Sequence, residues 1–194
     1  MINGYSLLKE IYIDFDEDDR TPNGIDLRLG KVYELNDVIE QHSDCFIGYG
    51  LYNNEITGYV KEKELPSQIE IKPKFLDCCN IQGWNLLPNK VYVLEVDRKI
   101  CIGKNSAQLY KPRSTLLRAG IVVYTAVGDS GYCGHLQFMC INHSHSPFFL
   151  EKGVRFAQLI DFQVEGSDIQ YDGDYQEESI DDEFEKLDNW RIQI

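Results

Sequence analysis

The sequence predicts an all-β fold built as one domain. Its second half consists of short apolar runs separated by glycines and prolines, at intervals typical of a β-sandwich or β-barrel. No regular alternation of strands and helices occurs, and neither of the glycine-rich motifs of the Rossmann and P-loop folds is present. The length of 194 residues is that of one domain, and 43% hydrophobic residues suffice for a sizeable core.

The predicted elements follow from local apolar patterns. A short N-terminal helix is expected over residues 5–11, where apolar residues recur at helical spacing, and a strand over residues 25–29, where apolar and polar residues alternate. The later strands are expected over residues 90–96, 107–110, 121–125, 135–141, 148–150 and 156–162. All of these elements belong to one predicted domain, residues 1–167.

Two regions depart from this pattern. Residues 32–82 are polar and uneven, so we interpret them as a peripheral insertion with short strand candidates at 45–52, 56–60 and 69–71. Residues 168–194 form an acidic tail.

The net charge of −13 argues against a broad basic face for nucleic acid. Ten carboxylates and one lysine stand between Asp168 and Asp188, so most of the acidity belongs to the tail, and residues 1–167 carry only −5. The domain can therefore hold a local cationic pocket for a small anion. No apolar run reaches the roughly 20 residues that span a bilayer, and no leader pattern opens the chain. We expect a cytoplasmic protein with neither nucleic acid nor membrane as partner.

Six cysteines occur without a C-x-x-C pair or regular spacing, so we expect reduced, mostly buried thiols rather than disulfides or a zinc site. The motifs of serine hydrolases and zinc-dependent deaminases are also missing, since there is no G-x-S-x-G and no H-x-E with P-C-x-x-C. The chemistry must come from other polar clusters.

Four polar clusters are embedded in the predicted strands. They read Asn-Gly-Ile-Asp-Leu-Arg at residues 23–28, Lys-Pro-Arg-Ser-Thr-Leu-Leu-Arg-Ala-Gly at 111–120, Val-Gly-Asp-Ser-Gly-Tyr-Cys-Gly at 127–134 and Gly-Val-Arg-Phe-Ala-Gln-Leu-Ile at 153–160. In this order and spacing they resemble the motifs of the dUTPase and dCTP deaminase superfamily, and the resemblance covers about two thirds of the chain. The predicted first helix and the first cluster resemble the deaminase branch more closely.

The resemblance implies a dUTPase-like distorted β-barrel that assembles as a homotrimer. Active sites would lie at subunit interfaces, with Mg²⁺ held by the phosphates of a deoxyuridine or other pyrimidine nucleotide. Asp129 matches the catalytic aspartate, a carboxylate that orients and deprotonates the water attacking phosphorus. From the residues alone, an aspartate that forms a turn before Ser130 and Gly131 is favoured. With the resemblance, catalysis is favoured.

The resemblance also implies a phosphate-binding set, Arg113, Ser114, Arg118 and Gln158. A guanidinium matches a phosphate in bidentate fashion, and a hydroxyl can donate to it. Ser114 also suits the N-cap of a short helix that Gly120 ends, and the two roles are compatible.

Strand alternation places Gln158 on one face with Phe156 and Ile160. An amide among apolar side chains needs a hydrogen-bond partner. We therefore expect Gln158 to contact either the phosphates or a neighbouring subunit, as the resemblance implies.

The nucleoside contacts that the resemblance implies are Tyr132, Val127 and Gly128. Tyr132 would pack under the deoxyribose and leave no room for a 2′-hydroxyl, although an ordinary core tyrosine explains the residue equally well. Asp26 of the first cluster would touch Mg²⁺ through water, and its plain alternative is a salt bridge with Arg28.

Three departures from the superfamily pattern bear on the activity. Met139 stands where the deaminases carry a glutamate that activates water, and a thioether cannot act as a general base. The tail lacks a glycine-rich arm of the dUTPase type and has Asp174 where the deaminase branch has a lysine. Thr115 stands where dUTPases prefer glycine.

The leading functional hypothesis is hydrolysis of dUTP to dUMP and pyrophosphate with Mg²⁺. One alternative is an inactive nucleotide-binding regulator of the same fold, suggested by Asp174 and the acidic tail. The other is a dCTP deaminase with a displaced general base.

Overall fold

The computed structural model describes residues 2–3, 15–35, 49–52, 55–58, 68–76, 81–166, 169–173 and 175–176. Its elements, in chain order, are β1 (Ile2–Asn3), the 3₁₀ helix η1 (Glu17–Asp19), β2 (Arg20–Thr21), β3 (Gly24–Leu35), β4 (Tyr49–Tyr52), β5 (Glu55–Gly58), β6 (Gln68–Glu70), β7 (Lys74–Leu76), β8 (Ile81–Leu86), β9 (Val91–Cys101), β10 (Ser106–Pro112), α2 (Ser114–Arg118), β11 (Ile121–Tyr124), β12 (Val127–Gly128), β13 (Cys133–Asn142), β14 (Phe148–Glu151) and β15 (Arg155–Gln163).

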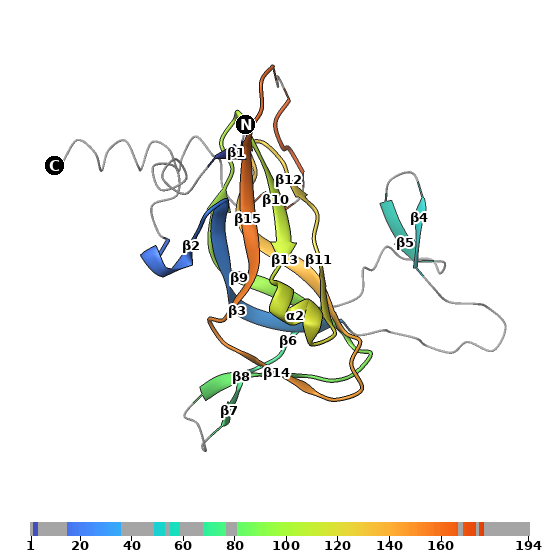
Figure 1. Cartoon of the computed structure of the whole chain (residues 1–194). Helices are drawn as coiled ribbons and strands as arrows, with labels where there is room; N and C mark the ends of the chain where they lie inside the picture. Colours follow the sequence, from blue (N-terminus) through green and yellow to red (C-terminus); the bar gives the residue numbers. More distant parts are fainter. Residues whose placement is uncertain are drawn as a thin grey trace.

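One curled antiparallel sheet dominates the molecule, in the order β11-β13-β9-β3-β15-β10-β12 (Figure 1). The short strands β1, β2 and β6 add to β15 and β3. A smaller sheet has the order β14-β8-β7, and β4 and β5 form a hairpin. The expectation of an all-β fold is therefore confirmed.

The strands predicted in the second half of the chain are confirmed with small shifts at their ends, except that β9 continues five residues beyond its predicted end at residue 96. The first predicted strand is longer than expected, because β3 continues to Leu35 and Val32 is fully buried in the core. The predicted start of the insertion at residue 32 is therefore too early. The predicted helix at 5–11, Asp174 and residues 177–194 of the acidic tail lie outside the described residues.

Strand β3 joins the two halves of the curled sheet. Its first part pairs with β15, where Ile25 lies opposite Leu159, and its second part pairs with β9. The pairing with β9 shifts register next to Gly30. A Cβ at Gly30 would lie 2.7 Å from the Cα of Asp97, so only glycine permits this close approach of the two strands.

The core is formed by the inward faces of the large sheet. Its aromatic centre comprises Tyr110, Phe138 and Phe156, with ring centroids 5.0 Å apart for Tyr110 and Phe138 and 6.0 Å apart for Phe138 and Phe156. The expected strict alternation of β15 is wrong at its start, because a register shift between Arg155 and Ala157 lets Phe156 and Ala157 both become buried. Phe156 therefore does not share a face with Gln158.

The expectation of reduced thiols is wrong for one pair of cysteines. Cys101 and Cys133 lie directly opposite each other on β9 and β13 and form a disulfide. They are 32 residues apart, so only the pairing of the two strands brings them together. Cys140 is a free buried thiol, and burial raises its pKa to about 12. Within the described ranges, no helix combines the length and apolarity needed to cross a bilayer.

We predict that Phe156→Ala lowers the free energy of unfolding by about 3 to 5 kcal/mol, because a fully buried aromatic ring leaves a cavity at the centre of the core. Urea denaturation at one fixed protein concentration measures this change. The control is Leu87→Ala, whose side chain is 47% exposed and which should cost less than about 1 kcal/mol. Equal losses in the two variants would contradict the placement of Phe156 in the core.

Candidate functional site

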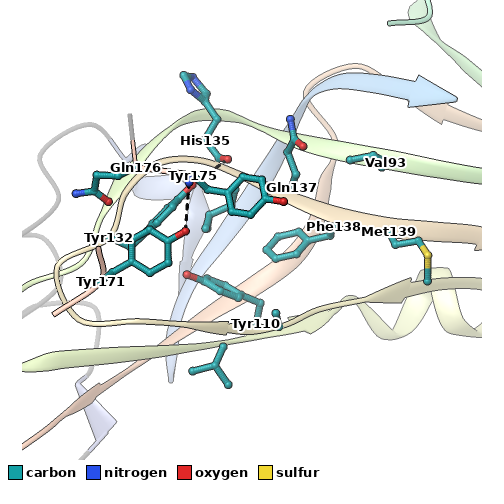
Figure 2. Close-up of a pocket in the computed structure, with 13 residues that line it drawn as sticks. Val93, Tyr110, Tyr132, His135, Gln137, Phe138, Met139, Tyr171, Tyr175 and Gln176 are labelled. Carbon is teal, nitrogen blue, oxygen red and sulfur yellow. Dashed lines mark hydrogen bonds between the residues drawn. The ribbon is translucent and has the colours of Figure 1, made fainter. Parts of the chain in front are cut away.

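A pocket of about 620 Å³ lies between β13, the β11–β12 connection and the segment 171–176 (Figure 2). Of the predicted nucleoside-binding residues, Tyr132 and Val127 line it. Gly128 is buried and is not among the lining residues, and a Cβ added to it would overlap the Tyr110 hydroxyl oxygen and lie 2.6 Å from Ile102 Cδ1. The absence of a side chain at Gly128 therefore lets β12 pack against β10.

Asp129 begins a tight turn whose far end is Tyr132. The Tyr132 N–H donates to the Asp129 carbonyl at 3.2 Å, and Gly131 adopts a φ of 85°, which favours glycine. Ile102 holds the turn from the neighbouring segment, because its N–H donates to the Tyr132 carbonyl at 2.7 Å and its carbonyl accepts from Gly131 at 3.0 Å. The Asp129 side chain is exposed. The turn-forming role and a role in catalysis are therefore compatible at this position.

A buried polar network supports this turn from below. The Ser130 hydroxyl donates to the Ser106 carbonyl at 2.6 Å, and the Ser106 hydroxyl donates to the Asp161 carboxylate at 3.3 Å. Gln108 donates to the other carboxylate oxygen of Asp161 at 3.4 Å, and the Tyr110 hydroxyl donates to Gln108 at 2.8 Å. Asp161 and Gln108 are fully buried. These bonds fix the strand end that carries the Asp129 turn.

Tyr171, Tyr175 and Gln176 cover one side of the pocket. Gln176 makes two hydrogen bonds to the turn, accepting from the Cys133 N–H at 3.1 Å and donating to the Gly131 carbonyl at 3.0 Å. The rings of Tyr132 and Tyr171 meet edge to face with centroids 5.4 Å apart. Figure 2 shows Tyr171, Tyr175 and Gln176 grouped beside Tyr132.

Sequence reasoning missed these covering residues as part of the site. The run Tyr-Asp-Gly-Asp-Tyr-Gln at 171–176 was the available signal, because it resembles the deaminase-branch tail, but sequence alone does not show what it contacts. Sequence reasoning also missed the pocket-facing side of β13, where His135, Gln137 and Met139 alternate with core residues. Met139, which replaces the deaminase glutamate in sequence, is one of these wall residues.

Arg113 and Gln158 lie together at a second site, next to Asp26. Arg113 follows the last residue of β10 and forms an ion pair with Asp26, and Arg155 lies 3.9 Å from the same carboxylate oxygen. Gln158, directly opposite Asp26 in the β15–β3 pair, donates to the Thr21 hydroxyl at 2.7 Å. This hydroxyl provides the partner that the amide was expected to need. The arrangement gathers two guanidinium groups and an amide, which suit a phosphate.

The alternative salt bridge between Asp26 and Arg28 is wrong, because Arg28 instead binds Asp19 at 2.7 Å. Asp26 is only 2% exposed, and burial raises its pKa although Arg113 and Arg155 oppose the effect. Its Oδ1 is buried and has no hydrogen-bond partner among the described residues.

The described residues contain no group of three or more His, Cys, Asp or Glu side chains placed to hold a metal ion. The carboxylate of Asp26 is paired with arginine through Oδ2, while Oδ1 retains the capacity to accept a hydrogen bond. The described part of the chain therefore fits a water-mediated contact from Asp26 to a magnesium ion held by another ligand.

Helix α2 carries the other two predicted phosphate-binding residues, Ser114 and Arg118. Both side chains are exposed. The expected N-cap role of Ser114 is wrong, because the N-cap is Arg113, with no capping side-chain hydrogen bond, and Ser114 is the first helical residue. The helix ends before Gly120, as expected, and Gly120 has a φ of 78°.

The Asp129 turn and the Arg113 cluster lie at opposite ends of β10 (Figure 1). Gly128 pairs with Gln108 near the start of this strand, whereas Arg113 follows its last residue. At a rise of about 3.3 Å per residue, five residues of strand separate the two groups by about 17 Å. The chain thus brings the predicted nucleoside residues together, and brings Arg113, Gln158 and Asp26 together, without joining the two sets.

We predict that Gln176→Leu accelerates amide hydrogen exchange at Cys133, because the leucine cannot accept the hydrogen bond from that N–H. Exchange monitored by mass spectrometry or NMR measures the effect. Gln163→Leu, an exposed substitution at the end of β15, serves as the control and should leave the exchange unchanged. Unaltered protection in Gln176→Leu would contradict the docking of this segment on the turn.

Comparison with known proteins places the chain among nucleotide enzymes. A family model described as dCTP deaminase-like matches residues 5–164. A probable deoxyuridine 5′-triphosphate nucleotidohydrolase of Methanothermobacter thermautotrophicus is 40% identical over 91% of this chain and 100% of its own length. The deoxyuridine 5′-triphosphate nucleotidohydrolase of Methanocaldococcus jannaschii is 30% identical over 90% of this chain and 98% of its own length.

Among solved structures, the 2′-deoxycytidine 5′-triphosphate deaminase of Agrobacterium tumefaciens aligns with a TM-score of 0.55 at 18% identity. The alignment covers 82% of this chain and 46% of that one, and it supports the fold alone. The family model and the relatives together cover the main strands of the large sheet, the Asp129 turn and the Arg113 cluster. The chain belongs to the dCTP deaminase-like family.

Proposed function

We propose that this protein hydrolyses dUTP to dUMP and pyrophosphate. The observation that carries the proposal is a pocket of nucleoside size, lined by Tyr132, on the same turn as the exposed carboxylate of Asp129. The relatives named as deoxyuridine 5′-triphosphate nucleotidohydrolases support the substrate, because two of them align over at least 90% of the chain at 30 to 40% identity.

In the proposed reaction, Asp129 accepts the proton of the water that attacks the α-phosphorus. The bond between this phosphorus and the oxygen bridging to the β-phosphate breaks, and pyrophosphate leaves. A carboxylate held on a rigid turn suits this role, because phosphoryl transfer depends mainly on positioning and charge neutralisation. Tyr132 would pack against the deoxyribose, Val127 would form the pocket edge beside it, and Gly128 would support that edge by letting β12 pack against β10.

Arg113, Ser114, Arg118 and Gln158 are proposed to bind the phosphates. Within one chain the Arg113 cluster is about 17 Å from the Asp129 turn, too far for one nucleotide's reacting phosphate to contact both. We therefore propose a homotrimer in which one subunit supplies the nucleoside pocket and its neighbour supplies the phosphate cluster.

Exposed apolar side chains near both clusters support such an assembly. Leu117 lies on α2 beside the phosphate residues, and Tyr124, Val127 and Met139 lie near the pocket, all with at least 39% of their surface exposed. Apolar surface of this kind is typical of protein contact regions.

We propose that Mg²⁺ enters with the nucleotide, bound by its phosphate oxygens. The ion would supply neutralisation of the phosphate charge. Asp26 Oδ1 would accept a hydrogen bond from a water of the ion's hydration shell, which would satisfy an otherwise unpartnered buried oxygen.

We predict that Asp129→Asn folds normally and lowers dUTP turnover by about 100-fold or more, because the amide retains the shape but cannot accept the proton. Chromatographic detection of dUMP measures turnover, and circular dichroism verifies the fold. Asp97→Asn, on an exposed part of β9, is the matched control and should retain turnover. Near-normal turnover of Asp129→Asn would contradict the assignment of the catalytic residue.

The shared site has a separate test by complementation. Asp129→Asn and Arg113→Gln should each be inactive alone, but coexpressed mixed trimers should recover activity, because some interfaces pair an intact turn with an intact phosphate cluster. Recovery measured on the isolated mixed assembly supports the subunit arrangement. A mixed assembly that remains inactive would contradict it while leaving hydrolysis by the wild-type protein untouched.

We predict that dCTP yields neither dUTP nor dUMP, because Met139 occupies the pocket wall where deamination requires a base that activates water. Ammonia release and product chromatography measure this reaction. Ammonia above the level given by heat-denatured protein would favour the deaminase alternative instead.

A further inference from the structure

A buried carboxylate lies next to the wall of the pocket, directly opposite Gln137 in the pairing of β9 with β13. Glu95, on β9, is 6% exposed and accepts three hydrogen bonds. Lys31 Nζ donates to Oε1 at 2.9 Å, while the Tyr33 hydroxyl and the Gln137 amide each donate to Oε2 at 2.8 Å. The donors come from β3 and β13, the two strands that flank β9.

This network fixes which end of the Gln137 amide faces Glu95. Burial raises the pKa of Glu95, but hydrogen bonds from Gln137, Lys31 and Tyr33 outweigh it and hold the pKa below its usual value. Glu95 is therefore an ionised acceptor at neutral pH. An ionised carboxylate has no proton to donate, so Gln137 must turn its NH₂ group towards Glu95 and its Oε1 away.

Gln137 belongs to the pocket wall. Figure 2 shows it between His135 and Met139 along β13, and its side chain is exposed. Its Oε1 makes no hydrogen bond within the part of the chain that the structure describes. The wall therefore presents one oriented acceptor next to the apolar side chains of Met139 and Val93.

We propose that Gln137 selects the base by accepting a hydrogen bond from N3–H of uracil, and that Glu95 is the positioning residue that holds its amide in the accepting orientation. This inference rests on the proposed function, because it assigns the base recognition of the same pocket.

The hydrogen-bonding edges of the two pyrimidines explain the selection. Uracil carries a proton on N3 and can donate to Gln137 Oε1. Cytosine carries a lone pair on N3, so the same pose would bring two acceptors together, and both would lose their hydrogen bonds to water without gaining a partner. Cytosine can offer its 4-amino group only by shifting in the pocket, because this group lies one ring atom away.

The experiment compares binding of the non-hydrolysable α,β-imido analogues of dUTP and dCTP by calorimetry. Gln137→Leu removes the acceptor at similar size, and we expect the preference for the dUTP analogue to fall at least tenfold, mainly through weaker binding of that analogue. Gln137→Met provides a second variant if the first misfolds. Gln82→Leu, on the exposed side of β8, should keep the wild-type preference. An unchanged preference in folded Gln137→Leu or Gln137→Met would overturn the inference.

Glu95→Gln tests the positioning role. A glutamine at this position can both donate and accept, so the Gln137 amide gains access to either orientation. The affinity for the dUTP analogue should then fall more than the affinity for the dCTP analogue, so the preference falls. The melting temperature should change little. A purely structural role predicts weaker binding of both analogues in parallel, which would overturn the positioning role. Glu151→Gln, exposed on β14, is the matched control.

The failure of this inference is distinguishable from failure of the proposed function. Wild-type protein that prefers the dUTP analogue but does not hydrolyse dUTP contradicts only the hydrolase activity. If the wild-type protein hydrolyses dUTP and the Gln137 variants keep the preference for the dUTP analogue, only the base selection is contradicted. Wild-type protein that binds neither analogue contradicts both.

Discussion

The extended strand β10 holds the two halves of the candidate site apart. It is hydrogen-bonded to β15 along its length and to β12 at its start, so its ends cannot approach each other without breaking the sheet. The Asp129 turn is attached to one end, and Arg113 follows the other. On the proposed assignment of the phosphate-binding residues, a nucleotide bound at the turn would receive its phosphate contacts from another copy of the chain.

Buried polar groups position the turn and the pocket wall of the candidate site. Asp161 anchors Ser106 and Gln108 below the turn, and Glu95 orients Gln137 in the pocket wall. Burying a carboxylate is costly unless donors surround it, and a satisfied network rigidifies its surroundings. Glu95 meets this condition with three donors. Asp26 does not, because one of its buried oxygens has no hydrogen-bond partner among the described residues.

The same pocket architecture can support different chemistry through single wall positions. Met139 and Gln137 lie on one face of β13, two residues apart. A general base at position 139 would activate a water for attack on the pyrimidine ring. The thioether of Met139 cannot do so and adds only apolar contact. An oriented acceptor at position 137 would select among bases without reacting with them. The proposed distinction between hydrolysis and deamination thus depends on side chains, while the strand itself is unchanged.

Local patterns were sufficient to predict the all-β class and the strands of the second half, because alternation and turn residues act over a few neighbouring positions. The clusters containing Asp129, Arg113 and Gln158 were singled out by their resemblance to superfamily motifs, not by such patterns. The disulfide between Cys101 and Cys133, the burial of both Phe156 and Ala157, and the partner of Arg28 could not be predicted from local patterns. Each depends on the register between strands that are distant in the chain. The docking of Gln176 on the turn and the orientation of Gln137 by Glu95 were likewise decided only by the tertiary structure, because a hydrogen bond between distant segments leaves no periodic signal in the sequence.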